Sequence, residues 1–265
     1  MATVEEWLAL TDRLYAKGVD VFDGAHPPVT DEGTRDPKVV ALTLLARTLS
    51  HVKAVVLLLD QGLIVEARTI SRSAYENFFW LAALVKKGAA FVDAIELDDI
   101  TSRKKRATGL LEWAKAQGQI EGYQANLEGF RDRLRDEHGK TASIVLLQAA
   151  VDGGVGDSII VYRELSSDSA HPTAQSLSRH VTLNDSEEGP PFTVHAEPVT
   201  DPAEASDTLE LLCTAVLGAV VAANQALGGV EVGERLDALA AESRRLSDSN
   251  KADRDAQQET GATER

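Results

Sequence analysis

Apolar and polar residues alternate with a helical period along most of the chain. Between residues 3 and 21, large apolar side chains recur every three or four positions, as is typical of an amphipathic helix. The same period predicts further helices, at about residues 37–61, 63–86, 89–117, 119–138, 202–227 and 230–246, and a shorter helical pattern at 141–151. The sequence therefore predicts an all-α fold, a multi-helix bundle.

Local signals mark the start and the end of the helix at 37–61. Asp36 followed by Pro37 is a favourable helix start, because the Asp side chain accepts from the first free amides and Pro fits the first turn. The helix itself is almost entirely apolar apart from a narrow polar stripe, so we expect it to be buried on most sides. Only Gln61 and Gly62 separate it from the next helix, which indicates antiparallel neighbours.

Residues 180–197 depart from the helical pattern. Apolar residues alternate with other residues on either side of a Gly-Pro-Pro turn, Val181 and Leu183 before it and Phe192 and Val194 after it. This alternation predicts one short β-hairpin. Residues 247–265 contain no large apolar side chain, so we expect them to form a disordered C-terminal tail. Most other connections are short, which favours a single helical domain over residues 1–246.

Composition narrows the functional classes. The net charge of −15 opposes nonspecific approach to nucleic acid or anionic lipid, so we expect no broad DNA-binding surface. Cys213 is the only cysteine, which excludes an intrachain disulfide and a cysteine-rich zinc site. The N-terminus lacks the apolar core of a signal peptide, and the longest uncharged run, about 211–228, falls short of the roughly 20 apolar residues of a membrane span. We expect a cytoplasmic protein without a membrane segment.

Cofactor and metal motifs are missing from the sequence. It contains no His-Glu-x-x-His, no phosphate-binding Gly-rich loop and no nucleophile elbow. His180 and His195 could face each other across the hairpin, but a metal pair would need a carboxylate such as Glu197. We expect neither a metal nor a cofactor.

The helix at 63–86 carries three charged residues at a spacing of four. Arg68, Arg72 and Glu76 therefore lie along one stripe of the helix. One interpretation is an Arg72–Glu76 pair on a solvated face. The other interpretation is a polar seam that faces a cleft. Large aromatic residues and the absence of lysine before Lys86 indicate a helix that is packed on most sides. A buried arginine in such a seam would meet an anionic ligand or a paired carboxylate.

A second group of polar residues occurs in the stretch VYRELSSDSAHP, residues 161–172. If it is helical, Tyr162 and Ser166 share one side, and Pro172 should end the helix at His171. His171 with Arg163 nearby would suit general acid–base work. The alternative is a capping cluster, in which Ser and Asp satisfy loop amides and His171 closes the helix end.

Two of these stretches together resemble a known family. GLIVEARTISRSAYENFFWL resembles a Gly, Glu-Ala, Arg-Ser-x-x-Glu signature, and VYRELSSDSAHP resembles a Tyr-x-x-Leu-Ser then His-Pro signature. Both occur in this order in a bacterial helical family of unknown function, over roughly residues 40–175. The resemblance implies a helical fold but no reaction, and it implies a shared polar seam formed by the following matching positions: Arg72, Glu76, Tyr162, Ser166 and His171.

The chain also resembles, more distantly, the HEPN superfamily of small helical proteins. Many of these are ribonucleases of toxin–antitoxin and phage-defence systems, and they carry an Arg, four to six residues, then a His. Seven residues separate Arg163 from His171, which departs from that pattern. The resemblance implies a metal-independent endoribonuclease, commonly a homodimer, in which His acts as acid or base on RNA and Arg stabilises the phosphorane.

Two functional hypotheses follow from the sequence. In the first, a helical module binds a small anionic ligand or a partner through Arg68, Arg72, Glu76, Tyr162 and Ser166, in a stress or phage-defence context. In the second, Arg163 and His171 cleave RNA.

Overall fold

A computed structural model describes residues 2–28, 30–118, 121–139, 142–184, 190–201, 203–229 and 234–263. Most of them are helical, which confirms the predicted all-α class. The longer helices are α1 (Val4–Gly24), α2 (Pro37–Asp60), α3 (Ile64–Lys87), α4 (Ala89–Ala116), α5 (Glu121–His138), α9 (Ala203–Leu227) and α10 (Leu236–Thr263). The shorter ones are α6 (Leu146–Asp152), α7 (Ile159–Leu165) and α8 (Ala174–Ser178), with single turns η1 (Gly33–Arg35), η2 (Gly156–Ser158) and the π-helical η3 (Ser166–Ala170).

The helix starts follow local chemistry. Thr3 caps α1 in a capping box, in which its side chain accepts from the Glu6 amide and the Glu6 carboxylate accepts from the Thr3 amide. Asp36 caps α2 by accepting from the Lys38 amide, with Pro37 in the first turn, as the sequence predicts. The capped ends fix where these two long helices begin.

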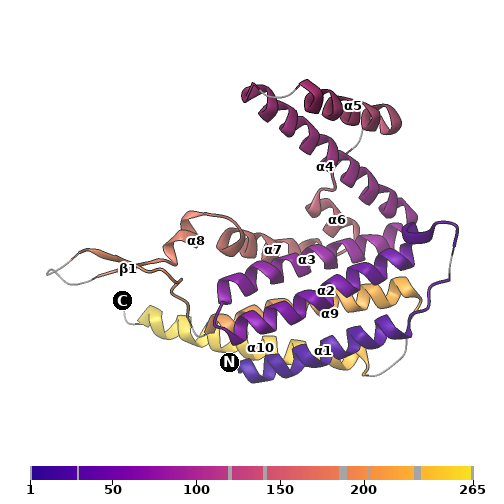
Figure 1. The fold of residues 1–265 in the computed structure, drawn as a ribbon. Coiled ribbons are helices and arrows are strands. Elements are labelled where there is room, and N and C mark those ends of the chain that lie inside the picture. Colours follow the sequence, from indigo (N-terminus) through magenta and orange to yellow (C-terminus); the bar gives the residue numbers. More distant parts are fainter. Residues whose placement is uncertain are drawn as a thin grey trace.

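The core lies where α1, α2, α3 and α9 pack side by side (Figure 1). Its largest fully buried side chains include Trp7, Tyr75 and Phe79. Gly218 of α9 faces the Phe78 ring so closely that an added Cβ would come within 2.5 Å of it. A glycine here therefore lets α9 and α3 approach each other.

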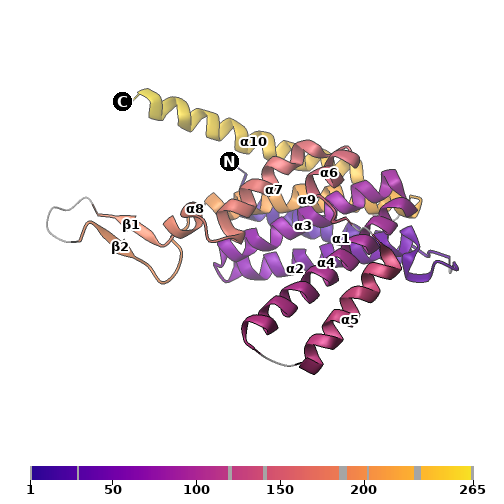
Figure 2. The same ribbon diagram turned by 90° about the horizontal axis from the view of Figure 1, so that it is seen from above.

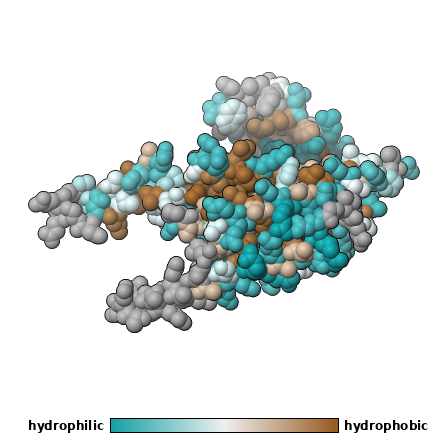
Figure 3. Space-filling model, turned by 90° about the horizontal axis from the view of Figure 1, so that it is seen from below, coloured by the Kyte–Doolittle hydropathy of each residue, from teal (hydrophilic) through white to brown (hydrophobic). Residues whose placement is uncertain are grey.

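Helices α2 and α9 are long and apolar enough to cross a membrane by length and composition alone. The core helices of a globular bundle pass the same test, so the length and composition of these two helices argue only weakly for a membrane span. More than half (56%) of the apolar window of α9 is buried inside the protein, against 28% for α2. Figure 3 shows apolar residues gathered on the part of one face nearer the β-hairpin. The expectation of a cytoplasmic protein stays a prediction.

Two elements project from the bundle. Helices α4 and α5 contact each other and extend away from the other helices as an arm (Figures 1 and 2). The predicted β-hairpin is confirmed: β1 (Val181–Leu183) pairs antiparallel with β2 (Phe192–Val194). The central residues of its turn, 185–189, lie outside the described residues.

Helix α10 continues past residue 246, the expected end of the helical domain. Asn250 is almost fully buried; its side-chain oxygen accepts from the Ala2 amide at 2.8 Å and its amide donates to Glu210 at 2.7 Å. The absence of large apolar residues after 246 predicted a disordered tail. The helical turn at Asn250 is instead held by hydrogen bonds, which do not require apolar side chains. The division into one domain and a tail otherwise stays a prediction.

Candidate functional site

The predicted polar stripe of α3 faces α7. Arg72 and Glu76 form an ion pair at 3.2 Å, with 19% and 32% of their side chains exposed. The pair of the first interpretation is thus present, but its side chains are partly covered instead of lying on a solvated face.

Tyr162 of α7 completes this group. Its hydroxyl donates to Glu76 Oε1 at 3.1 Å and accepts from Arg72 Nη2. The Arg72 guanidinium also lies over the Tyr162 ring, 4.6 Å from its centroid. Burial, and next the charge of Glu76, raises the pKa of the Tyr162 phenol, so the hydroxyl keeps its proton near neutral pH. The structure thus joins three of the predicted residues in one cluster.

The cluster leaves a donor without a partner. The Nε of Arg72 is buried, and no acceptor among the described residues contacts it. A buried N–H without an acceptor costs free energy, so this atom is a place where a water or a ligand oxygen would stabilise the site.

A cavity of about 290 Å³ opens beside this cluster. Its polar lining comes from Arg47 of α2 and from Glu76, Asn77 and Tyr162. Its apolar lining consists of Leu44, Trp80, Ile144 and Leu146. Arg47 is exposed, and no carboxylate in the described part of the chain forms an ion pair with it. The cavity therefore has one cation whose charge is not neutralised by a direct partner.

His51 contacts Asn77, which lines this cavity. Asn77 Nδ2 donates to Thr48 Oγ1 at 3.2 Å and lies 3.4 Å from His51 Nδ1. Burial, and then the charge of Arg47, lowers the pKa of His51. Asn77, a residue that the sequence analysis did not select, thus links His51 to the wall of the cavity.

Arg68 belongs to a separate, buried network. Its Nε donates to Asp168 Oδ2 at 2.6 Å, and Arg179 reaches both oxygens of Asp168 at 2.8 and 2.9 Å. Arg179 also pairs with Glu204 at 2.7 Å. Burial lowers the pKa of Arg179, but the bonds to Glu204 and Asp168 outweigh it, so the net shift is upward. At Arg68 the buried arginine meets a paired carboxylate, which was one of the two partners expected for it.

The segment after α7 ends as Pro172 predicts. The π-helical turn η3 is followed by His171 in an extended conformation, φ −130° and ψ 150°. The capping role falls to Thr173 and Ser176, which form a capping box at α8. In the capping alternative Asp168 would satisfy loop amides, whereas its carboxylate accepts from Arg68 and Arg179.

The remaining predicted residues lie apart from the cluster. Arg163 and His171 are both exposed, and no hydrogen bond or ion pair links either side chain to another described residue. The His171 carbonyl, not its ring, accepts from Ser176 Oγ at 2.8 Å. Ser166 is half-buried, and its hydroxyl has no hydrogen bond within the described ranges. Nothing in these contacts unites Ser166 or His171 with Arg72 and Glu76.

The two hairpin histidines are engaged within the hairpin. His180 Nδ1 lies 3.1 Å from the His195 carbonyl, and His195 Nε2 lies 2.7 Å from Thr182 Oγ1. In the part of the chain that the structure describes, no three His, Cys, Asp or Glu side chains are grouped so as to hold a metal ion.

Fold and site together define a helical bundle with a cavity between its helices that is lined by both polar and apolar side chains. The chain matches the Family of unknown function (DUF5677) over residues 38–189 and belongs to that family. The match runs from α2 to the hairpin, so it includes the Arg72–Glu76–Tyr162 cluster and every residue that lines the cavity. The resemblance to an uncharacterised family is confirmed. Neither a curated protein nor a solved structure matches the chain.

Proposed function

We propose that the protein binds a small organic anion in the cavity between α2, α3 and α7. The observation that carries this proposal is a 290 Å³ cavity that has Arg47 at its wall without a direct carboxylate partner. The volume lies near the lower end of the roughly 300–1,000 Å³ of ligand sites, which suits a ligand of metabolite size.

The wall chemistry narrows the class of ligand. Arg47 supplies a guanidinium, which binds a carboxylate or phosphate through two parallel hydrogen bonds. Asn77 and Tyr162 supply further polar groups, and the Trp80 indole gives a flat apolar surface for the body of the ligand. Because Arg72 neutralises Glu76, the carboxylate in the wall does not repel the anion as an unpaired one would.

The test is a binding screen of the full chain against carboxylates and phosphate monoesters of metabolite size. Thermal shift finds the anions that bind, and isothermal titration calorimetry measures their affinity for the protein and for Arg47→Gln. We expect Arg47→Gln to weaken binding roughly 10- to 100-fold, because it removes a charge-assisted contact. Arg106→Gln, at an exposed position of α4, is the matched control and should bind as the unmodified protein does.

Two results would contradict the proposal. One is that no anion raises the melting temperature; the other is that Arg47→Gln binds as tightly as Arg106→Gln. The ribonuclease hypothesis makes a different prediction, namely RNA cleavage that is lost in His171→Ala and kept in Arg47→Gln. Arg163 and His171 do not contact each other among the described residues, so their geometry gives the ribonuclease hypothesis no support. The bacterial defence context remains a prediction from the resemblance.

A further inference from the structure

The cavity beside Arg47, which we name the Arg47 cavity, has a hydrogen-bond acceptor without a donor in its wall. Asn77 lines this cavity, and only 3% of the residue is exposed. Thr48 Oγ1 donates its proton to the Leu44 carbonyl at 2.8 Å, so it accepts from Asn77 Nδ2 at 3.2 Å. This bond fixes which end of the amide is the nitrogen. The oxygen, Oδ1, receives no hydrogen bond within the described ranges, so a ligand N–H would stabilise it.

Glu76 supplies a second acceptor to the same wall. The Tyr162 hydroxyl donates to Glu76 Oε1 at 3.1 Å, and Arg72 Nη2 lies 3.2 Å from the same oxygen. The other oxygen, Oε2, accepts no hydrogen bond from a described residue. Glu76 and Asn77 are consecutive in α3 and both line the cavity. Two acceptors are therefore available to a ligand in neighbouring parts of the wall.

The Arg47 cavity combines these acceptors with a cation. Arg47 and Glu76 both line it, yet the two side chains form no ion pair with each other. A guanidinium suits a carboxylate, whereas carboxylate and amide oxygens suit an ammonium with its three N–H groups. The rest of the lining is apolar and consists of Leu44, Trp80, Ile144 and Leu146. The wall thus complements a ligand that has a carboxylate, an ammonium and an apolar body.

We propose that the Arg47 cavity binds a free α-amino acid with an apolar side chain. The carboxylate accepts from Arg47, and the ammonium donates to Asn77 Oδ1 and Glu76 Oε2. The side chain lies against Trp80 and Ile144. This inference rests on the proposed function, because Arg47 holds the carboxylate in both, and it adds the ammonium as a second point of recognition.

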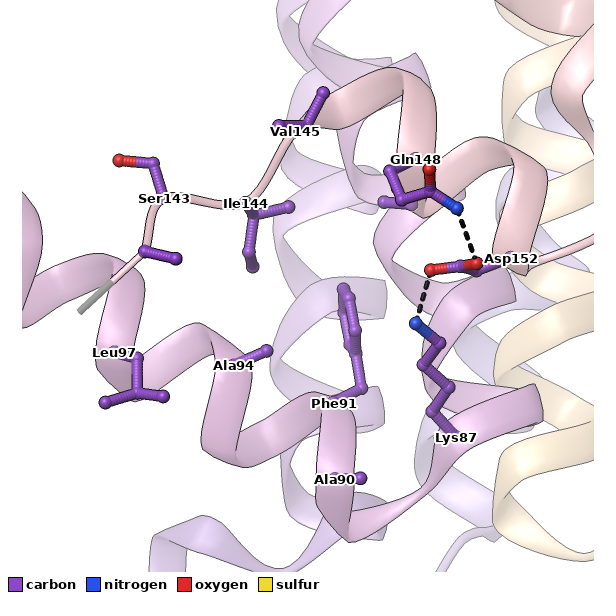
Figure 4. Close-up of a pocket in the computed structure, with 12 residues that line it drawn as sticks. Lys87, Ala90, Phe91, Ala94, Leu97, Ser143, Ile144, Val145, Gln148 and Asp152 are labelled. Carbon is purple, nitrogen blue, oxygen red and sulfur yellow. Dashed lines mark hydrogen bonds and ion pairs between the residues drawn. The ribbon is translucent and has the colours of Figure 1, made fainter. Parts of the chain in front are cut away.

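Ile144 sets the space for the side chain of the ligand. A second cavity, of about 520 Å³, also has Ile144 in its wall (Figure 4). Near Ile144 this second cavity is lined by apolar residues of α4, namely Phe91, Ala94 and Leu97. The Ile144 amide donates to Asp98 Oδ1 at 2.8 Å, which holds the residue at α4. Shortening Ile144 should therefore join two apolar spaces and admit a larger side chain.

Three probes with the same apolar body test the two charged groups. L-Leucine, 4-methylpentanoate, which lacks the ammonium, and 3-methylbutylamine, which lacks the carboxylate, are titrated into the full chain by calorimetry. We expect leucine to bind roughly 10- to 100-fold more tightly than either, because each analogue loses a charge-assisted contact. Binding of 4-methylpentanoate as tight as that of leucine would overturn the inference and leave the proposed function intact. Tighter binding of the amine, or no binding of leucine, would also overturn it.

Glu76→Gln tests the ammonium contact. The variant loses the negative charge beside the ammonium and leaves Arg72 without its counter-ion, so it should weaken leucine binding and strengthen 4-methylpentanoate binding. The preference for leucine should fall roughly tenfold or more. Glu112→Gln, at an exposed position of α4 that lines neither cavity, is the matched control and should keep the preference. An unchanged preference in Glu76→Gln would overturn the ammonium assignment.

Ile144→Ala tests the space for the side chain. It should raise the affinity for L-tryptophan relative to L-leucine by roughly tenfold, because the larger ring buries more apolar surface. Leu147→Ala is the control, since this nearby residue is 39% exposed and lines neither cavity. An unchanged ratio in Ile144→Ala, or an equal change in both variants, would overturn the role of Ile144.

Discussion

Replacing Asp168 with asparagine removes one negative charge from the most deeply buried ion-pair network described in the chain. The Asp168 side chain is 3% exposed, and its partners Arg68 and Arg179 are 8% and 13% exposed. Asparagine keeps nearly the same shape, so the substitution leaves two guanidiniums facing an amide instead of a carboxylate. Glu204 still neutralises Arg179, whereas Arg68 has no second carboxylate among its described partners.

The burial of these groups sets the size of the effect. Removing one partner of a buried pair costs about 3–5 kcal/mol, because a charge stays buried without its counter-ion. For a protein of this size, 1 kcal/mol corresponds to about 2–4 °C in melting temperature. We therefore expect Asp168→Asn to lower the melting temperature by roughly 6–20 °C.

Urea denaturation followed by circular dichroism measures the loss of free energy of unfolding. Glu234→Gln is the matched control. Arg13 Nε donates to Glu234 Oε2 at 3.0 Å, and the side chains of Glu234 and Arg13 are 37% and 38% exposed. An exposed pair of this kind contributes about 0–1 kcal/mol. The reasoning fails if Asp168→Asn destabilises the protein no more than Glu234→Gln does.

Three further predictions concern packing, pH and association. Gly153→Ala puts a Cβ 2.6 Å from the Ala82 Cβ and should lower the free energy of unfolding by about 1–3 kcal/mol in urea denaturation. Gly109→Ala, in open space on α4, should raise it by about 0.4–1 kcal/mol, and equal effects of the two variants would contradict this. His51 has a lowered pKa, so the unfolded chain binds more protons below pH 6.5 and stability should fall as pH drops through that window; His51→Asn should flatten this dependence, and an unchanged pH profile would refute it. Leu183 is 81% exposed on an apolar hairpin face; if that face mediates the expected homodimer, Leu183→Lys should shift the protein to monomer in analytical ultracentrifugation, and a dimer that persists would place the interface elsewhere.

Much of the fold was predictable because helices depend on local sequence. The apolar period placed α1 to α5 and α9 to within a few residues, and Asp36 and Pro172 marked a start and an end that the structure confirms. The end of α10 was not predictable in this way. Its turn at Asn250 is held by hydrogen bonds to Ala2 and Glu210, and a scan for apolar residues does not detect such an anchor.

The candidate site was predictable in part. Arg72 and Glu76 share a face by their spacing of four, and the helical phase of Tyr162 allowed it to meet them. The role of Asp168 was missed because a Ser-rich helix end is an ordinary place for a capping residue. Its partner Arg68 is 100 positions away, and no local pattern indicates which of many arginines a carboxylate will meet.

The sequence alone determined most of the helical segments, where α2 begins, that a short hairpin interrupts the helices, and that α3 carries a polar stripe. These features arise from hydrogen bonds and side-chain spacing within a few residues. The tertiary structure alone decided that Tyr162 bridges Arg72 and Glu76, that Asp168 turns inward between Arg68 and Arg179, and that two cavities share Ile144. Those contacts depend on how distant helices dock, and docking is set by the shape and burial of the whole core rather than by any one segment.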